Sequence, residues 1–133
     1  MPGKLSSLVM GLTLSVMGAA SAFAQELSPI GIWEQDNREA RYEFSYCGEN
    51  GDRLCAKLIW IQEDKKDARN TKYLGTNMLR DARQTRVGHW SGTVTLEGFN
   101  FGGTVTQTSA NTMVLKGCAL FVLCEEVQFI RVQ

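Results

Sequence analysis

The chain has 133 residues, 44% of them hydrophobic, and its 14 basic and 14 acidic residues leave no formal net charge. This length is enough for one domain with one modest core. Without an excess of positive charge to neutralise phosphates, the protein is not expected to bind nucleic acid.

Residues 1 to 24 have the features of a secretory signal peptide. Lys4 supplies a positive charge, a mostly apolar run extends from Leu8 to Ala20, and Ala22-Phe23-Ala24 is an A-x-A cleavage site. The run is shorter than the roughly 20 apolar residues that span a bilayer, so stable membrane insertion is not expected. Cleavage leaves a single domain, residues 25 to 133, that we expect to be periplasmic or secreted.

Two strands are predicted around the turn-forming stretch 48 to 52. Apolar residues alternate with polar ones before and after it, at Tyr42, Phe44 and Tyr46 and then at Leu54, Ala56, Leu58 and Trp60. A period of two is typical of half-buried strands. We expect Cys47 opposite Cys55, because this register places both apolar sets, Trp60 included, on one face.

Residues 62 to 89 do not alternate, and we expect a long basic loop there. A short helix or strand fragment could form within it around Tyr73, Leu74, Met78 and Leu79. Its basic residues are interleaved with acidic ones, which is typical of a solvated surface. Long loops of this kind are lids, binding elements or disordered segments.

A third hairpin is predicted with Glu97-Gly98 at its turn. Its apolar face consists of Trp90, Gly92, Val94 and Leu96, then Phe99, Phe101, Gly103 and Val105. This register pairs Trp90 with Val105 and Gly92 with Gly103. Because paired glycines inside strands usually mark a bend, we expect them to curve a sheet that closes on itself.

The last hairpin is predicted from the two C-terminal cysteines. Pairing Cys118 with Cys124 places Lys116 opposite Glu126, and it places Met113 and Leu115 opposite Phe129 and Val127. An opposite-charge pair outside and apolar pairs inside are what one buried face requires.

The tip of this hairpin, residues 119 to 123, consists of five apolar residues. Two alternatives follow. Leu120, Phe121 and Leu123 fold back and plug one end of a barrel, or they form an exposed docking tip, since exposed apolar patches are rare unless functional.

The four cysteines are predicted to form two local disulfides, Cys47–Cys55 and Cys118–Cys124. Export to an oxidising compartment favours pairing. Crossed pairings, free buried thiols and a four-thiolate zinc site are the alternatives. Zinc ligand pairs are usually separated by two to four residues, whereas the gaps here are seven and five, so no metal or cofactor is expected.

Several short strands separated by turns, without a convincing long helix, indicate an all-β fold. We predict a small antiparallel barrel built from hairpins. A barrel is favoured because each hairpin must cover its apolar face and few residues remain for helices to do so.

A family resemblance supports this architecture. The segments "SPIGIW" (28 to 33), "YCGENGDRLCAKLIW" (46 to 60), "YLGTNML" (73 to 79), "HWSGTV" (89 to 94) and "LKGCALFVLCEEVQFIRV" (115 to 132) carry it. In this order they resemble the bacterial exported family called domain of unknown function 2147. The resemblance implies a secreted or periplasmic β-barrel and supplies no activity.

The chain ends carry a second, looser resemblance, to the calycins or lipocalin-like barrels. These folds begin with G-x-W, here Gly31-Ile32-Trp33, and an Arg of the last strand, here Arg131, packs across the Trp. The resemblance implies that Gly31, Trp33 and Arg131 close one end of the barrel. A guanidinium over an indole ring is a favourable cation–π pair.

No catalytic constellation is recognisable. His89 is the only histidine, and its place beside Trp90 at a strand start is more typical of a rim residue than of a general base. Nucleophile elbows, zinc-binding H-E-x-x-H motifs and phosphate-binding glycine loops are absent from the sequence. We therefore expect no catalytic residues and no enzymatic activity.

Two functions remain. The first is a carrier of a small apolar ligand, lined by Trp60, Trp90, Phe101 and Phe129, with Leu120 and Phe121 at the mouth. The second is a module that binds an exported protein, such as a hydrolase inhibitor or an envelope-stress protein. A fully packed interior would favour the second. The oligomeric state is left open.

Overall fold

The computed structural model describes residues 3, 11, 27–96, 98–119 and 123–133. Most of the predicted signal peptide lies outside the described residues, and so do Leu120 and Phe121 of the apolar tip. Cleavage after residue 24 and the role of the tip as a plug or a docking element therefore stay predictions.

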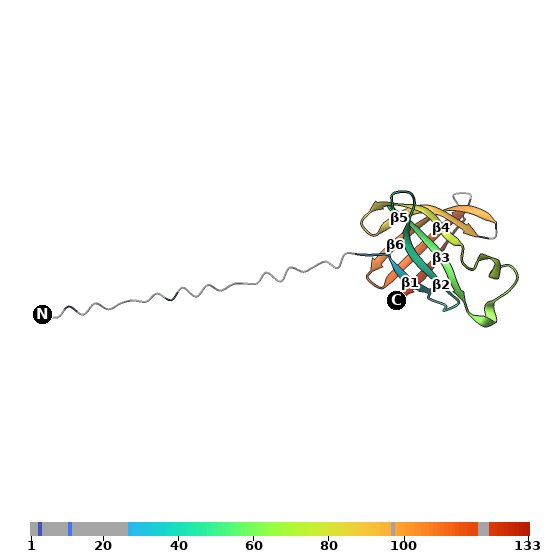
Figure 1. Ribbon diagram of the computed structural model, residues 1–133, viewed down its shortest axis with the longest axis horizontal. Coiled ribbons are helices and arrows are strands. Elements are labelled where there is room, and N and C mark those ends of the chain that lie inside the picture. Colours follow the sequence, from blue (N-terminus) through green and yellow to red (C-terminus); the bar gives the residue numbers. More distant parts are fainter. Residues whose placement is uncertain (1–2, 4–10, 12–26, 97, 120–122) are drawn as a thin grey trace.

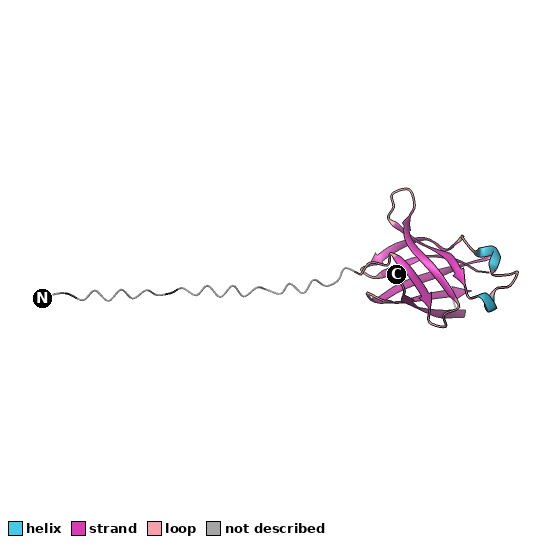
Figure 2. Cartoon of the chain, turned by 60° about the horizontal axis from the view of Figure 1, so that its bottom comes forward, coloured by secondary structure: helices cyan, strands magenta, loops and turns pink. Residues whose placement is uncertain are grey.

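The described residues of the domain form eight strands and two short 3-10 helices (Figures 1 and 2). They are β1 (Gly31–Gln35), β2 (Ala40–Cys47), β3 (Arg53–Ile61), η1 (Glu63–Lys65), η2 (Thr71–Tyr73), β4 (Asn77–Arg86), β5 (His89–Leu96), β6 (Phe99–Ser109), β7 (Thr112–Ala119) and β8 (Leu123–Arg131). Each strand pairs antiparallel with the next, and β8 pairs with β1 to close the barrel. The predicted all-β antiparallel barrel is confirmed.

The connections alternate between the two ends of the barrel, because consecutive strands run in opposite directions. We call one end the closed end; it holds residues 27–30 and the loops 48–52, 87–88 and 110–111. The other, the open end, holds residues 36–39 and 62–76 and the final residues of β5 and β7. Figure 2 shows the two helices beyond the strands, on the side of the open end.

The third and last hairpins have the predicted registers. Trp90 pairs with Val105 and Gly92 with Gly103 across β5 and β6. Across β7 and β8, Lys116 pairs with Glu126, Leu115 with Val127, and Met113 with Phe129. A Cβ atom at Gly92 would lie 2.6 Å from the Cα of Ala82, so the glycine lets β4 approach β5 closely.

The first hairpin differs from the prediction in two ways. Both disulfides are present, but Cys47 lies opposite Arg53 and Cys55 opposite Ser45, so the first disulfide is diagonal. The register also shifts beside Tyr42, which pairs with Leu58 while Arg41 pairs with Trp60. The extra residue of this bulge reverses the parity beyond it.

Trp60 consequently lies on the outside of the barrel. Its side chain is 37% exposed, and the guanidinium of Arg41 lies 4.7 Å from its ring centre. The prediction that Trp60 faces the interior is wrong. It assumed that inward and outward side chains alternate without interruption along β3, but the bulge opposite Tyr42 breaks this alternation and the sequence does not mark it.

The expectation of a loop over residues 62 to 89 is wrong for its second half. Asn77–Arg86 is β4, a full member of the barrel. Its pairing with both neighbours shifts register, Asp81 has a positive φ of 50°, and the adjacent residues Met78 and Leu79 are both buried. These irregularities remove the period of two from the sequence.

Residues 62–76 form the surface excursion that was predicted for the whole segment. Asp67 organises it, since its Oδ1 accepts hydrogen bonds of 2.8 Å from the backbone N–H groups of Arg69 and Asn70. Tyr73 attaches the excursion to the barrel by packing against a small cluster of Ala40, Leu58, Ile61 and Met78.

Candidate functional site

The closed end of the barrel is sealed by Arg131 and Trp33. The two residues pair across β1 and β8, and the guanidinium lies 4.4 Å from the centre of the indole ring. Arg131 also donates hydrogen bonds to the backbone carbonyls of Ser28, Ile30 and Ala110. The side chain therefore ties the entering segment, the last strand and the β6–β7 turn together.

Gly31 permits this close contact. Its φ is 142°, and a Cβ atom there would lie 2.5 Å from Nη1 of Arg131. A side chain at this position would therefore displace the guanidinium. Trp33 adds a further anchor, because its Nε1 donates a 2.9 Å hydrogen bond to the carbonyl of Pro29. This is the arrangement that the resemblance to calycins implied for the three residues.

The half of the barrel next to the closed end is packed with buried side chains. Its core contains Trp33, Leu54, Ala82, Trp90, Val105 and Met113, all buried. Trp90, predicted to line a ligand cavity, is only 4% exposed and belongs to this packed half. Its Nε1 has no hydrogen-bond partner among the described residues.

The half next to the open end contains a cavity of about 400 Å³. Aromatic and aliphatic side chains of β2, β5, β6, β7 and β8 form most of its wall, among them Phe44, Val94, Phe101, Leu115, Val127 and Phe129. Leu96 and Leu123 also line it and are 48% and 66% exposed. The cavity therefore opens to solvent between these two strand ends.

A few polar groups interrupt the apolar wall. Tyr42 lies within it, with its ring 5.5 Å from that of Phe129 in an edge-on arrangement, and burial raises the pKa of its hydroxyl. Gln35 and Thr95 contribute neutral polar atoms. Among the described lining residues, Glu125 carries the one charge. Convergent polar groups in an apolar pocket are typical of ligand sites.

The structure brings together only part of the predicted ligand-binding set. Phe101 and Phe129 line the cavity, whereas Trp60 lies outside the barrel and Trp90 lies in the packed half. Residues that the sequence reasoning did not assign to a site are Tyr42, Phe44, Val94, Leu115, Glu125 and Val127. All of them occupy the alternate strand positions whose side chains face the barrel interior. This alternation in the sequence was the feature that could have identified them.

The remaining chemistry-bearing residues lie away from this cavity. His89 begins β5 near the closed end, with its Nδ1 3.2 Å from the hydroxyl of Thr106. Within residues 27–96, 98–119 and 123–133, no three His, Cys, Asp or Glu side chains are grouped so that they could hold a metal ion.

No described helix has the length and apolar character needed to cross a membrane.

No curated protein and no solved structure matches the chain. A family model described as "Uncharacterized protein conserved in bacteria (DUF2147)" matches residues 31–131, which extend from the start of β1 to the end of β8. The chain belongs to this bacterial family.

Proposed function

We propose that this protein is an exported, non-enzymatic β-barrel that binds a small apolar molecule in the cavity at its open end. The observation that carries the proposal is the cavity itself, about 400 Å³ and walled mainly by apolar side chains. Ligand pockets typically measure roughly 300 to 1,000 Å³ and are lined mainly by hydrophobic and aromatic residues.

An empty space of this size is unusual in a protein interior. Cores are packed as densely as organic crystals, and few voids exceed one water molecule. In this barrel the side chains around Trp33 and Met113 form a buried cluster, while those around Phe101 and Val127 line the cavity. A ligand that fills the cavity accounts for the difference.

The frame around the cavity is preformed. The strands close into a complete barrel, and one disulfide clamps each end, Cys47–Cys55 beside the closed end and Cys118–Cys124 beside the open end. A preorganised site loses little conformational entropy when it binds, so even a small ligand retains most of its favourable contacts.

Two observations support export. The chain belongs to a bacterial family, and its four cysteines form two disulfides, which persist mainly in oxidising compartments such as the periplasm or the extracellular medium. The signal-peptide features of residues 1 to 24 agree with this location.

Filling the cavity tests the proposal. Val127→Trp adds bulk inside the cavity, whereas Ile130→Trp adds similar bulk on the same strand at a side chain that is 52% exposed on the outer surface. We expect decanol, measured by calorimetry, to bind the wild type and Ile130→Trp but not Val127→Trp. Circular dichroism checks that both variants fold. Equal decanol binding by all three proteins, or by none, would contradict the proposal.

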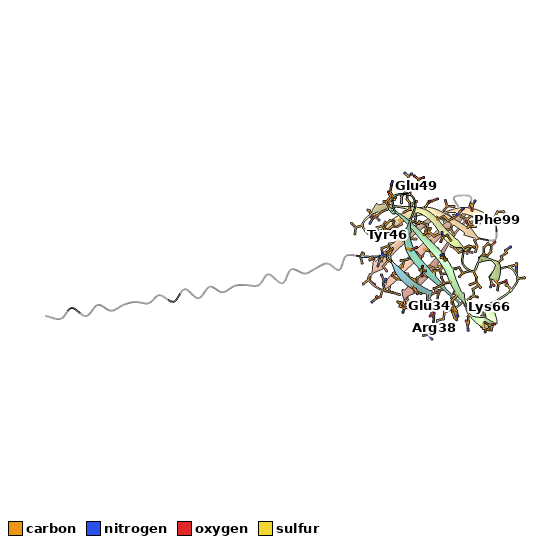
Figure 3. The ribbon with its side chains drawn as sticks, viewed as in Figure 1. Glu34, Arg38, Tyr46, Glu49, Lys66 and Phe99 are labelled. Atoms are coloured by element: carbon orange, nitrogen blue, oxygen red, sulfur yellow. A yellow bond between two sulfur atoms is a disulfide. The ribbon has the colours of Figure 1, made fainter. Side chains whose placement is uncertain are left out.

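A second function is supported by the rim of the open end. Phe99 and Leu123 are each 66% exposed there, and Figure 3 shows Phe99 and Tyr46 on opposite sides of the barrel. Exposed apolar side chains gathered at one place favour a protein-interaction module, such as an inhibitor of an exported hydrolase. Phe99→Ser would weaken binding to such a partner and leave decanol binding unchanged.

A further inference from the structure

A carboxylate stands at the mouth of the apolar cavity. Glu125 lies on β8 with the same parity as Val127 and Phe129, and all three line the cavity. Its partner across β7 is Gly117, which has no side chain to cover it. Glu125 therefore faces inward at the place where a molecule would enter the aromatic interior from solvent.

Among the described residues, no basic side chain is paired with Glu125. None of the described lysine or arginine side chains lines the cavity. The neighbouring Glu126 has the opposite parity and lies across from Lys116. The two adjacent carboxylates thus have different surroundings, because only Glu125 faces the ligand space.

An uncompensated carboxylate acts on a ligand in two ways. It attracts a cationic head group, and it repels an anionic one, which is a common means of rejecting a wrong partner. The deeper wall around Phe44, Phe101 and Phe129 has no charged side chain that could pair with a cationic or an anionic head group. A charged head group there would lose its hydration without compensation, so it remains at the mouth while an apolar tail enters.

We infer that the cavity selects single-chain amphiphiles with a cationic, amine-type head group beside Glu125 and discriminates against carboxylate-headed molecules such as fatty acids. This inference rests on the proposed function, since it assigns a ligand class to the same cavity. The tail lies between Phe101 and Phe129, and the head group remains partly solvated at the open end.

Three probes with the same tail separate the head-group contribution from tail burial: decylamine, decanol and decanoate. Calorimetry at low ionic strength, where screening is weakest, gives their Kd values for the wild type, Glu125→Gln, Glu125→Lys and Glu126→Gln. Glu126→Gln is the matched control, because it removes the same charge from the adjacent position on the outer face.

We expect the wild type to bind decylamine most tightly and decanoate least tightly. For a partly exposed charge pair the preference should fall about two- to fivefold in Glu125→Gln. Glu125→Lys should reverse the order, and Glu126→Gln should retain it. Decanol should bind all four proteins alike, because its head group carries no charge.

Failure of the inference is distinguishable from failure of the proposed function. Equal affinity for the three probes, tighter binding of decanoate, or the same loss of preference in Glu126→Gln as in Glu125→Gln would overturn the head-group selection and leave the cavity a ligand site. Absence of binding for all three probes, decanol included, would overturn both.

Discussion

The guanidinium of Arg131 lies 4.4 Å above the indole ring of Trp33, and this contact joins the last strand of the barrel to the first. In this pair a side-chain interaction adds to the backbone pairing of β1 with β8. The hydrogen bonds of Arg131 to Ser28, Ile30 and Ala110 extend the contact to three carbonyl groups.

Replacing Arg131 by Ala should lower the free energy of unfolding by about 2 to 4 kcal/mol. The change removes a cation–π pair and charge-assisted hydrogen bonds, and it leaves partly buried carbonyl groups without their donor. Urea denaturation measures the loss. Arg69→Ala, in the exposed excursion, is the control and should change stability by less than about 0.5 kcal/mol. An unchanged midpoint for Arg131→Ala would contradict this account of barrel closure.

Removing the two disulfides separately should have different effects on binding. Each closes a short ring, so the pairs of Cys→Ser substitutions should each cost roughly 2 to 3 kcal/mol of stability. Cys118–Cys124 lies at the open end next to the cavity lining residues Ala119 and Leu123, whereas Cys47–Cys55 lies at the far end. Decanol affinity should therefore fall only when Cys118 and Cys124 are replaced. Equal losses for both variants would refute this distinction.

Gly92→Ala should destabilise the barrel by about 1 to 3 kcal/mol, as overpacking does. A Cβ atom at this position would lie 2.6 Å from the Cα of Ala82 and 2.7 Å from the carbonyl oxygen of Arg80, both of which belong to the backbone of β4. Gly102→Ala is a matched control in the same hairpin, because nothing lies within 4 Å of its added Cβ. Thermal unfolding should show a lower Tm for Gly92→Ala alone, and a lower Tm for both would argue against the close approach of β4.

Alkaline pH should destabilise the protein through Tyr42. Burial raises the pKa of its hydroxyl in the folded state, so the folded protein binds this proton more tightly than the unfolded chain does. The stabilisation is complete below the unfolded pKa of about 10 and is lost as the pH rises above it towards the folded value. Tyr42→Phe should reduce the loss of stability in this range, measured by urea denaturation at pH 9 to 11. An identical pH profile for the variant would show that another group is responsible.

Where strands are regular, the period of two predicts the structure down to single pairs. The hairpin that joins Trp90 to Val105 and the hairpin that joins Lys116 to Glu126 were predicted in their observed registers. Both hairpins are paired without a register shift, so parity on one strand determines parity on the next. The local disulfides follow from the same argument, although the first is diagonal and not directly across.

Where bulges interrupt the ladder, the period of two no longer predicts which side chains face inward. One extra residue beside Leu58 moves Trp60 to the outside, and irregular pairing around Asp81 hides β4 within a segment that reads as a loop. A bulge depends on how a strand must bend to meet both neighbours, which is a property of the closed barrel and not of the strand's own residues.

Local alternation and spacing in the sequence determined the two disulfides and the registers of the hairpins that join Trp90 to Val105 and Lys116 to Glu126. The contact of Trp33 with Arg131 was implied by the resemblance of the chain ends to calycins. The tertiary structure alone decided that Trp90 lies in a packed half while Phe101 and Phe129 surround a cavity with Glu125 at its mouth. Whether inward side chains fill a barrel depends on their summed volume against the space enclosed by eight strands. The enclosed space is defined only when β8 pairs with β1 and closes the barrel.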